Sequence, residues 1–234
     1  FDANGDFKEI AIGTGPYKIT ENVMNKYVVL RRNDNYWGEK GKIKDFVVRN
    51  IPNTDTRYAA LKSGEIDGVL DLNAIPPFLA DEIKQDKRFA VASNKSTMIR
   101  YLALNNSRFP FNDVRMRQAV SLAIDRKNLV DALYMGYAEP TMNVLNYTSP
   151  GYKEFPLEYN LAKAKQLAHE VLGDKRCDVT YCINGAEQLQ KGEAELIAYW
   201  LGKIGLDVHI QSLEYATRAK MLRKGDYDIA RLQK

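Results

Sequence analysis

The last third of the chain alternates strand-like and helix-like segments with short links, and this order constrains the fold more than any other feature. Segments with apolar residues at helical spacing lie between short strand-like runs, and Gly205 is placed to end the first of them. Strand–helix–strand–helix–strand order predicts parallel strands joined by right-handed crossovers, which makes the fold α/β. The predicted strands span residues 179–183, 206–211 and 227–230, and the predicted helices span residues 189–204 and 215–224.

The N-terminal part of the chain predicts a small antiparallel sheet rather than a phosphate-binding loop. The stretch GTGPYKI (residues 13–19) places two glycines and a proline ahead of a strand-like run. A phosphate loop needs glycine amides that lead into a helix, but Pro16 lacks an N–H and a strand follows. The glycines therefore fit a tight turn that begins a hairpin, whose second strand is residues 27–32. Residues 45–51 predict a third strand, which Pro52 closes.

Capping residues locate the helices in the middle of the chain. Polar N-cap residues, prolines in the first turn and glycines after the last turn are the signals used. The predicted helices, with the residues expected to bound them, are 55–62 (Thr54 and Gly64), a helix through 85 (opened by Pro76 or Pro77), 114–135 (Asp113 and Gly136) and 161–172 (ended by Gly173).

Short strands and one long loop fill the space between these helices. Residues 68–72 (GVLDL) predict a short buried strand, residues 89–92 another, and residues 98–104 (MIRYLAL) a longer extended piece. Residues 137–159 form a loop rich in proline and tyrosine. Loops of this length in compact domains are often functional.

Composition excludes several classes of function. The chain is 45% hydrophobic and 27% charged, and its net charge of +4 is spread along the sequence. The absence of a dense Lys/Arg cluster or groove-reading motif argues against nucleic acid as a partner. The longest apolar runs are far shorter than a transmembrane helix requires. The sequence ends immediately after a strand-like run, so we expect it to be a segment of a longer protein.

Residues that could carry metal or nucleophile chemistry are few. Cys177 and Cys182 lie about 16 Å apart along one strand and point to opposite faces, so we expect free, buried thiols. His169 and His209 show no ligand spacing with a cysteine or carboxylate, and we expect solvent-facing or structural histidines. No nucleophile elbow is present, and the carboxylates of GEIDG (residues 64–68) fit a polar turn better than a catalytic dyad. The sequence therefore predicts no catalytic residue, no metal site and no cofactor.

The aromatic residues instead favour recognition of a ligand by stacking and hydrogen bonds. Each aromatic side chain alone is more often core or surface than a ligand contact, but as a set on loops they suit a binding protein. They are Tyr36, Trp37, Tyr101, Tyr134, Tyr137, Tyr147 and Tyr152.

Five strings that cover much of the chain stand in a characteristic order: GTGPYKI (13–19), NDNYWGEK (33–40), IPNTDTRYAALKSGEIDGV (51–69), LALNNSRFPFNDVRMRQAVSLAIDRKNLV (102–130) and LGKIGLDVHIQSLEYA (201–216). Together these strings resemble one family along nearly the whole chain: the large extracellular solute-binding proteins that deliver peptides or nickel to ABC importers. The resemblance implies a two-lobed α/β fold of the periplasmic-binding-protein type (type II), in which GTGPY begins a structural hairpin.

The resemblance also implies a division of the chain. Residues 1–97 would be part of lobe I, and residues 98–234 would be a crossover strand followed by the first part of lobe II. The N-terminal and C-terminal remainders of both lobes would lie outside this chain, together with a stretch of the family that carries major ligand contacts.

Ligand-binding positions are carried over from the family by position. Asn73 and Tyr134 match cleft-facing positions, and the segment from Ser96 to Tyr101 matches the crossover between lobes. Thr97 lies in that segment. Met98 and Arg100 are added from their place on the crossover. The Arg100 guanidinium fits the carboxylate of a peptide or of a metal chelate, and an interlobe salt bridge is the alternative.

The implied function is capture of small peptides between two closing lobes and delivery to the transmembrane subunits of an ABC permease. One alternative is a receptor for nickel or a metal chelate, because nickel-binding members hold the metal partly through small chelators. Another is the ligand-sensing half of a transcription regulator. The implied location is the periplasm or the extracellular face of the cytoplasmic membrane, and a lipid anchor on the full protein is left open.

Overall fold

The computed structural model describes residues 13–70, 75–185 and 188–233. The chain divides into two compact units, Phe1–Ile75 and Pro76–Lys234. Among the described residues, no helix combines the length and apolar character needed to span a bilayer.

The first unit contains a three-stranded antiparallel sheet and one helix. Strands β1 (Tyr17–Val23), β2 (Tyr27–Arg32) and β3 (Asp45–Arg49) pair in that order, so GTGPYKI does begin a hairpin. The Tyr17 hydroxyl donates to the carbonyl of Ile43 at 2.8 Å, and the Tyr17 ring meets the Phe46 ring edge-on at 5.1 Å. The stretch GTGPYKI therefore leads into a strand and not into a helix.

Helix α1 (Thr54–Ser63) follows the sheet. Its N-cap is Asn53 rather than Thr54, because the Asn53 side chain accepts a hydrogen bond from the backbone N–H of Thr56 at 2.9 Å. Gly64 ends the helix as predicted, with a left-handed φ of 80° that favours glycine.

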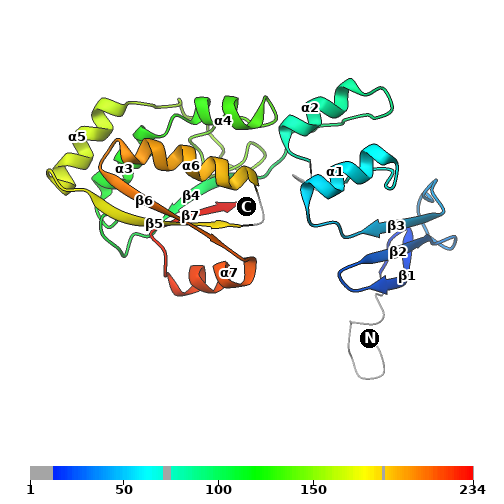
Figure 1. Ribbon diagram of the computed structural model, residues 1–234. Coiled ribbons are helices and arrows are strands. Elements are labelled where there is room, and N and C mark those ends of the chain that lie inside the picture. Colours follow the sequence, from blue (N-terminus) through cyan, green and yellow to red (C-terminus); the bar gives the residue numbers. More distant parts are fainter. Residues whose placement is uncertain (1–12, 71–74, 186–187, 234) are drawn as a thin grey trace. The chain divides into compact units, whose positions relative to one another are not determined.

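The second unit is built on a four-stranded sheet with the order β4-β7-β5-β6. Strand β5 pairs parallel with β6 and with β7, whereas β4 runs antiparallel to β7. Figure 1 shows α6 and α7 on opposite sides of this sheet. The strands are β4 (Arg100–Leu104), β5 (Cys177–Asn184), β6 (Leu206–Leu213) and β7 (Ile229–Gln233).

The helices of this unit lie close to their predicted positions, with one exception. The segment 114–135 is two helices, because Ile124 is extended and the Asp125 side chain caps the second helix at the N–H of Asn128, 2.9 Å away. The helices are α2 (Pro77–Gln85), α3 (Val114–Ala123), α4 (Arg126–Tyr134), α5 (Leu161–Leu172), α6 (Gln188–Gly202) and α7 (Tyr215–Lys224).

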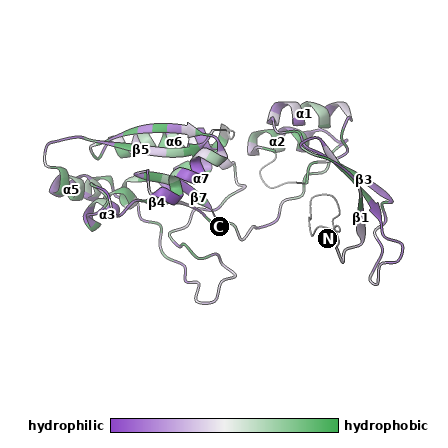
Figure 2. Cartoon of the chain, turned by 90° about the horizontal axis from the view of Figure 1, so that it is seen from below, coloured by the Kyte–Doolittle hydropathy of each residue, from purple (hydrophilic) through white to green (hydrophobic). Residues whose placement is uncertain are grey.

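The core of the second unit lies between the sheet and helices α3, α5 and α6. Alternation along β5 turns Val179, Tyr181 and Ile183 toward this core. Leu201 of α6 and Ile229 of β7 are fully buried in it. In Figure 2, hydrophobic residues appear on α6 and β5, whereas α7 is largely hydrophilic. One side of the sheet thus supplies most of the packing.

Two predicted strands do not form within the part of the chain that the structure describes. Residues 68–70 are not in a strand and Leu70 is 95% exposed, while residues 71–72 lie outside the described residues. Residues 89–92 form no ladder either. A strand requires a hydrogen-bonding neighbour, and none lies beside either segment in the part of the chain that the structure describes. Apolar content alone therefore did not predict strand formation at residues 68–70 or 89–92.

The long loop at residues 137–159 is irregular, as predicted. It packs on the start of the second unit: the Tyr137 hydroxyl donates to Asp81 at 3.0 Å, and Lys84 lies 4.4 Å from the centre of the Tyr137 ring. Helix α2 therefore belongs to the second compact unit, and the division falls between residues 75 and 76. The assignment of residues 1–97 and 98–234 to two lobes stays a prediction.

Candidate functional site

The carboxyl edge of the four-stranded sheet is the candidate site. Strands β5, β6 and β7 are parallel, so their carboxyl ends share one edge. The antiparallel strand β4 begins at this edge, where Arg100 pairs with Gln233 of β7. In open α/β sheets, ligands bind outside the carboxyl ends of the strands.

Five side chains at or near this edge form a connected network, here named the Arg100 cluster: Arg100, Tyr134, Glu193, Arg231 and Gln233. Arg100 donates a hydrogen bond to the Tyr134 hydroxyl, and the Tyr134 hydroxyl donates to Glu193 Oε1. Arg231 Nε donates to Glu193 Oε2 at 3.2 Å, and Arg231 Nη1 donates to Gln233 Oε1 at 3.0 Å. The network joins β4, α4, α6 and β7.

Strand alternation and helical spacing explain how these residues meet. Leu102 and Leu104 of β4 pack against the core, and Arg100 shares their face. Arg231 likewise shares the face of Ile229, which is in the core. Both guanidinium groups therefore point to the side of the sheet that α6 covers.

Glu193 is the centre of the cluster. Its carboxyl group is almost completely buried, and burial raises its pKa, while the nearby Arg231 and Arg100 act to lower it. Arg100 Nη1 lies 4.0 Å from Glu193 Oε1, and the Arg100 guanidinium lies 5.1 Å from the centre of the Tyr134 ring. The Arg100 side chain keeps 22% of its surface exposed, whereas Arg231 keeps 6%. Arg100 is thus the member of the arginine pair that reaches solvent.

The structure brings together two of the residues predicted from sequence, Arg100 and Tyr134. Arg100 contacts Tyr134 and Glu193, and both of these residues lie within the second unit. An interlobe salt bridge of Arg100 stays an alternative prediction. Asn73 lies outside the described residues. Tyr101 alternates to the opposite face of β4, so it does not join the cluster.

The remaining predicted residues precede β4. Ser96 and Thr97 are exposed, and Met98 is partly buried. The Ser96 hydroxyl accepts from the N–H of Met98 at 3.0 Å, which makes a local turn. The adjacent Lys95 pairs with Glu139 at 2.6 Å, which ties this segment to the long loop.

Glu193 and Arg231 were not among the predicted site residues. A signal for Glu193 exists in the sequence: it is spaced four and seven residues before the buried Ile197 and Trp200, so a carboxylate occupies the apolar stripe of a helix. Arg231 lies two residues after the buried Ile229, on the core face of a strand. A charged residue at a core position indicates a buried partner.

No cluster of metal-ligating side chains occurs among the described residues. His209 pairs with Asp178 at 2.6 Å and His169 with Asp174 at 3.8 Å, and all four side chains are exposed. Both histidines are therefore solvent-facing, as expected. The cysteines are free, but only Cys182 is fully buried, because Cys177 is partly exposed.

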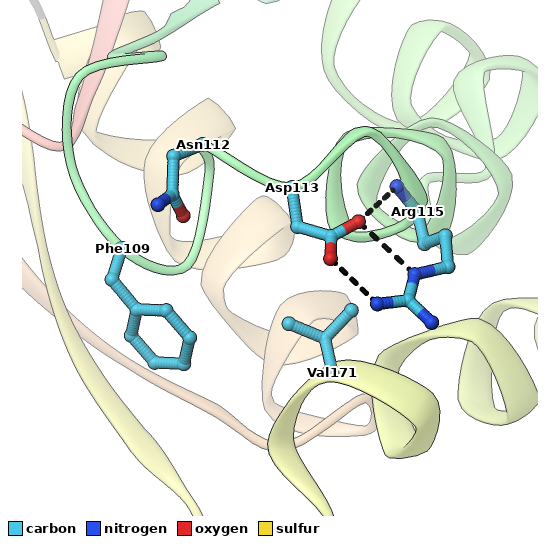
Figure 3. Close-up of a pocket in the computed structure, with 5 residues that line it drawn as sticks. All are labelled: Phe109, Asn112, Asp113, Arg115 and Val171. Carbon is cyan, nitrogen blue, oxygen red and sulfur yellow. Dashed lines mark hydrogen bonds and ion pairs between the residues drawn. The ribbon is translucent and has the colours of Figure 1, made fainter.

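A pocket of about 250 Å³ is lined by Phe109, Asn112, Asp113, Arg115 and Val171, whose side chains are drawn in Figure 3. Its charged groups satisfy one another. Asp113 accepts from the N–H of Arg115 at 2.8 Å as the cap of α3, and pairs with the Arg115 guanidinium at 2.7 Å. Arg115, a cation in the first turn of a helix, also lies 3.7 Å from Glu170 of α5. This pair stabilises the helix start, so we do not place the binding site here.

Residues 1–233 match the sequence model of the bacterial extracellular solute-binding proteins, family 5 Middle. The chain is 29% identical over 240 residues to the nickel-binding periplasmic protein of Escherichia coli, covering 92% of this chain and 44% of that protein. It is 27% identical over 230 residues to the periplasmic oligopeptide-binding protein OppA of Salmonella typhimurium, covering 94% of this chain and 42% of that protein. The chain therefore spans less than half the length of these relatives.

Solved structures show the same fold. NikA from Brucella suis, in complex with Fe(III)-EDTA, matches with a TM-score of 0.85 and 26% identity over 95% of this chain and 48% of that one. DppA from Helicobacter pylori, in complex with the peptide STSA, matches with a TM-score of 0.80 and 27% identity over 95% of this chain and 43% of that one. The fold is that of about half of a periplasmic binding protein.

Proposed function

Because the chain belongs to the bacterial extracellular solute-binding proteins, family 5, we propose that it is part of the solute-binding receptor of an ABC importer, and that its solute is a small peptide. Members of this family are binding proteins rather than enzymes. The observation that carries the proposal is the match over residues 1–233, together with the similarity to the peptide-bound DppA.

The full protein would work by closing two lobes on the solute and docking on the transmembrane subunits of the permease. Its place would be the periplasm, or the outer face of the cytoplasmic membrane through a lipid anchor. Relatives named as periplasmic proteins support the location.

Within this function, Arg100 would contact a carboxylate of the solute. It lies at the carboxyl edge of the sheet, its side chain is partly exposed, and its planar fork of N–H donors matches a carboxylate. Tyr134 would fix the plane of the guanidinium, and Ser96, Thr97, Met98 and Tyr101 would line the approach to it. The side-chain amide of Asn73 would add a further contact with the solute.

A metal chelate is the second candidate solute. The similarity to NikA bound to Fe(III)-EDTA and to the nickel-binding protein of E. coli favours it. A chelate whose small organic ligands supply the donors needs few protein ligands, so a chain without a histidine cluster among its described residues is compatible with it. Arg100 would then contact the carboxylate of the chelator.

The test is the native content of the full-length protein. Intact mass spectrometry under native and mildly denaturing conditions identifies what the protein carries, and metal analysis runs on the same sample. Release of mixed small peptides supports the peptide function. Stoichiometric nickel with a small acid, and no peptide, would replace it with the chelate. A lack of binding to both peptides and nickel chelates, in titrations of the stripped protein, would refute the receptor function for these solutes.

A further inference from the structure

We propose that Glu193 is a positioning residue, which sets the affinity for the solute by holding the Arg100 guanidinium in place. This inference rests on the proposed function, in which Arg100 receives a carboxylate of the solute. The Glu193 side chain itself is buried, so it does not contact the solute directly. Its role is therefore exerted through Arg100.

The path from Glu193 to Arg100 is short and continuous. Glu193 Oε1 accepts the hydroxyl hydrogen of Tyr134, and the same Tyr134 oxygen accepts a hydrogen bond from Arg100. The Glu193 carboxylate thus fixes the direction of the Tyr134 hydroxyl and leaves its lone pairs available to Arg100. A direct Coulomb attraction adds to this link, because Arg100 Nη1 lies 4.0 Å from Glu193 Oε1.

The other carboxylate oxygen is held by a second element of the sheet. Glu193 Oε2 accepts from Arg231 Nε at 3.2 Å, and Arg231 Nη1 donates to Gln233 at 3.0 Å. Gln233 pairs with Arg100 in the ladder between β7 and β4. Glu193 is consequently fixed at both oxygens and cannot follow Arg100 if that side chain shifts.

Burial of the Glu193 carboxylate is unfavourable for stability, so its presence at this position indicates another role. A buried carboxylate loses its hydration, and its pairing with arginine often does no more than offset that loss. A long guanidinium side chain that must meet a planar carboxylate gains affinity when its rotamer is fixed before binding. The Arg100 cluster supplies that fixation, while part of the Arg100 side chain remains exposed to solvent.

The solute class that follows is one with an accessible carboxylate. Either the C-terminus of a peptide or a carboxylate of a metal chelator has this chemistry. Two probe pairs separate the sources. One is a tryptic digest of casein with its methyl-esterified form. The other is nickel chloride with histidine, compared with nickel chloride with histidine methyl ester.

The experiment measures apparent Kd values for these probes on the full-length protein and its variants. We expect the wild type to bind one free-acid probe and to bind the matching ester about tenfold more weakly. Arg100→Gln and Glu193→Gln should each raise the apparent Kd for the free-acid probe by about tenfold. Glu193→Asp should recover part of the affinity. Glu195→Gln is the matched control, because Glu195 is exposed on the same helix, and it should bind like the wild type.

A double-mutant cycle separates positioning from general damage to the structure. If Glu193 acts through Arg100, Glu193→Gln should change the affinity of the Arg100→Gln protein by less than about twofold. Tyr134→Phe removes the hydroxyl link and keeps the ring, so it should weaken binding even if Glu193→Gln fails to fold. Circular dichroism verifies folding of each variant.

The positioning role of Glu193 and the receptor function are refuted by different results. The positioning role would be overturned if Glu193→Gln weakened the affinity for the free acid equally in the wild-type and Arg100→Gln backgrounds. It would also be overturned if the Glu193→Gln and Tyr134→Phe proteins both bound the free acid with wild-type affinity. Either outcome would leave the receptor function intact. Equal binding of free acids and esters would also overturn the positioning role. A wild-type protein that binds no probe of either pair would refute the proposed function and the inference together.

Discussion

Arg231 Nε lies 3.2 Å from Glu193 Oε2, and each side chain keeps less than a tenth of its surface exposed. One residue comes from the last strand of the sheet and the other from the helix that covers it. Their pairing fixes α6 on the sheet at the edge where Arg100 begins β4. The charged centre of the second unit therefore lies directly behind the candidate binding residue.

Breaking this pair should cost stability. Arg231→Met leaves the Glu193 carboxylate without its closest guanidinium, and removal of one partner of a buried pair costs about 3–5 kcal/mol. Urea unfolding of the full-length protein measures the loss. The double variant with Glu193→Gln should recover much of the loss, because the orphaned charge is gone. Additive losses in the double variant would contradict the pairing.

The core between α6 and the sheet gives a second prediction. Leu201 is fully buried in that core, so Leu201→Ala should lower the free energy of unfolding by about 2–5 kcal/mol. Tyr199 lies on the same helix but is 61% exposed, and Tyr199→Ala should cost less than about 1 kcal/mol. Similar losses for the two variants would mean that α6 does not pack as described.

Asp113 gives a prediction about pH. Hydrogen bonds from the side chain and backbone of Arg115 lower the pKa of Asp113 from 3.8 to about 2. Because the pKa is lower in the folded state than in the unfolded state, the stabilisation is complete above the unfolded value and disappears as pH falls through the folded value. An NMR titration of the carboxyl carbon should therefore show a midpoint near the lower value.

The matched variant is Asp113→Asn, which keeps a cap acceptor and removes the charge. Its melting temperature should lie below that of the wild type near neutral pH, and the difference should shrink as the wild-type carboxyl group becomes protonated. A difference that stays constant with pH, or a midpoint at the ordinary aspartate value, would contradict the pairing with Arg115.

The two thiols should differ in reactivity. Burial raises the pKa of both Cys177 and Cys182, but Cys182 is fully buried and Cys177 is partly exposed. The thiolate is the reactive form, so in the native protein Cys177 should react slowly with iodoacetamide and Cys182 more slowly still. Peptide mapping after timed labelling measures both rates. A disulfide between the two residues, or faster labelling of Cys182, would contradict the structure.

Sequence patterns located most of the second unit. Helices α5 and α7 have their predicted bounds, because apolar spacing and a capping residue such as Gly173 act within a few residues. The parallel order of β5 and β6 also followed from local signals. The split between α3 and α4 was missed because Ile124 continues the apolar spacing, and the cap by Asp125 is visible only in its hydrogen bonds.

Interactions between distant segments were harder to predict. Residues 68–70, the described part of the strand predicted at residues 68–72, form no strand, and strand formation depends on a neighbour that no local pattern reveals. The pairing of Glu193 with Arg231 joins residues 38 positions apart, and sequence alone gives only the sign that each charge sits at a core position. Arg100 and Tyr134 were named separately from the family resemblance, but their direct contact required the fold.

We propose that the full protein is a receptor whose lobes close on a carboxylate-bearing solute. Small-angle X-ray scattering tests this closure on the full-length protein, stripped of ligand, before and after addition of the casein digest or of nickel with histidine. We expect a smaller radius of gyration with one of these solutes, and no change with its methyl-esterified form. An unchanged radius with both free-acid solutes would contradict this closure.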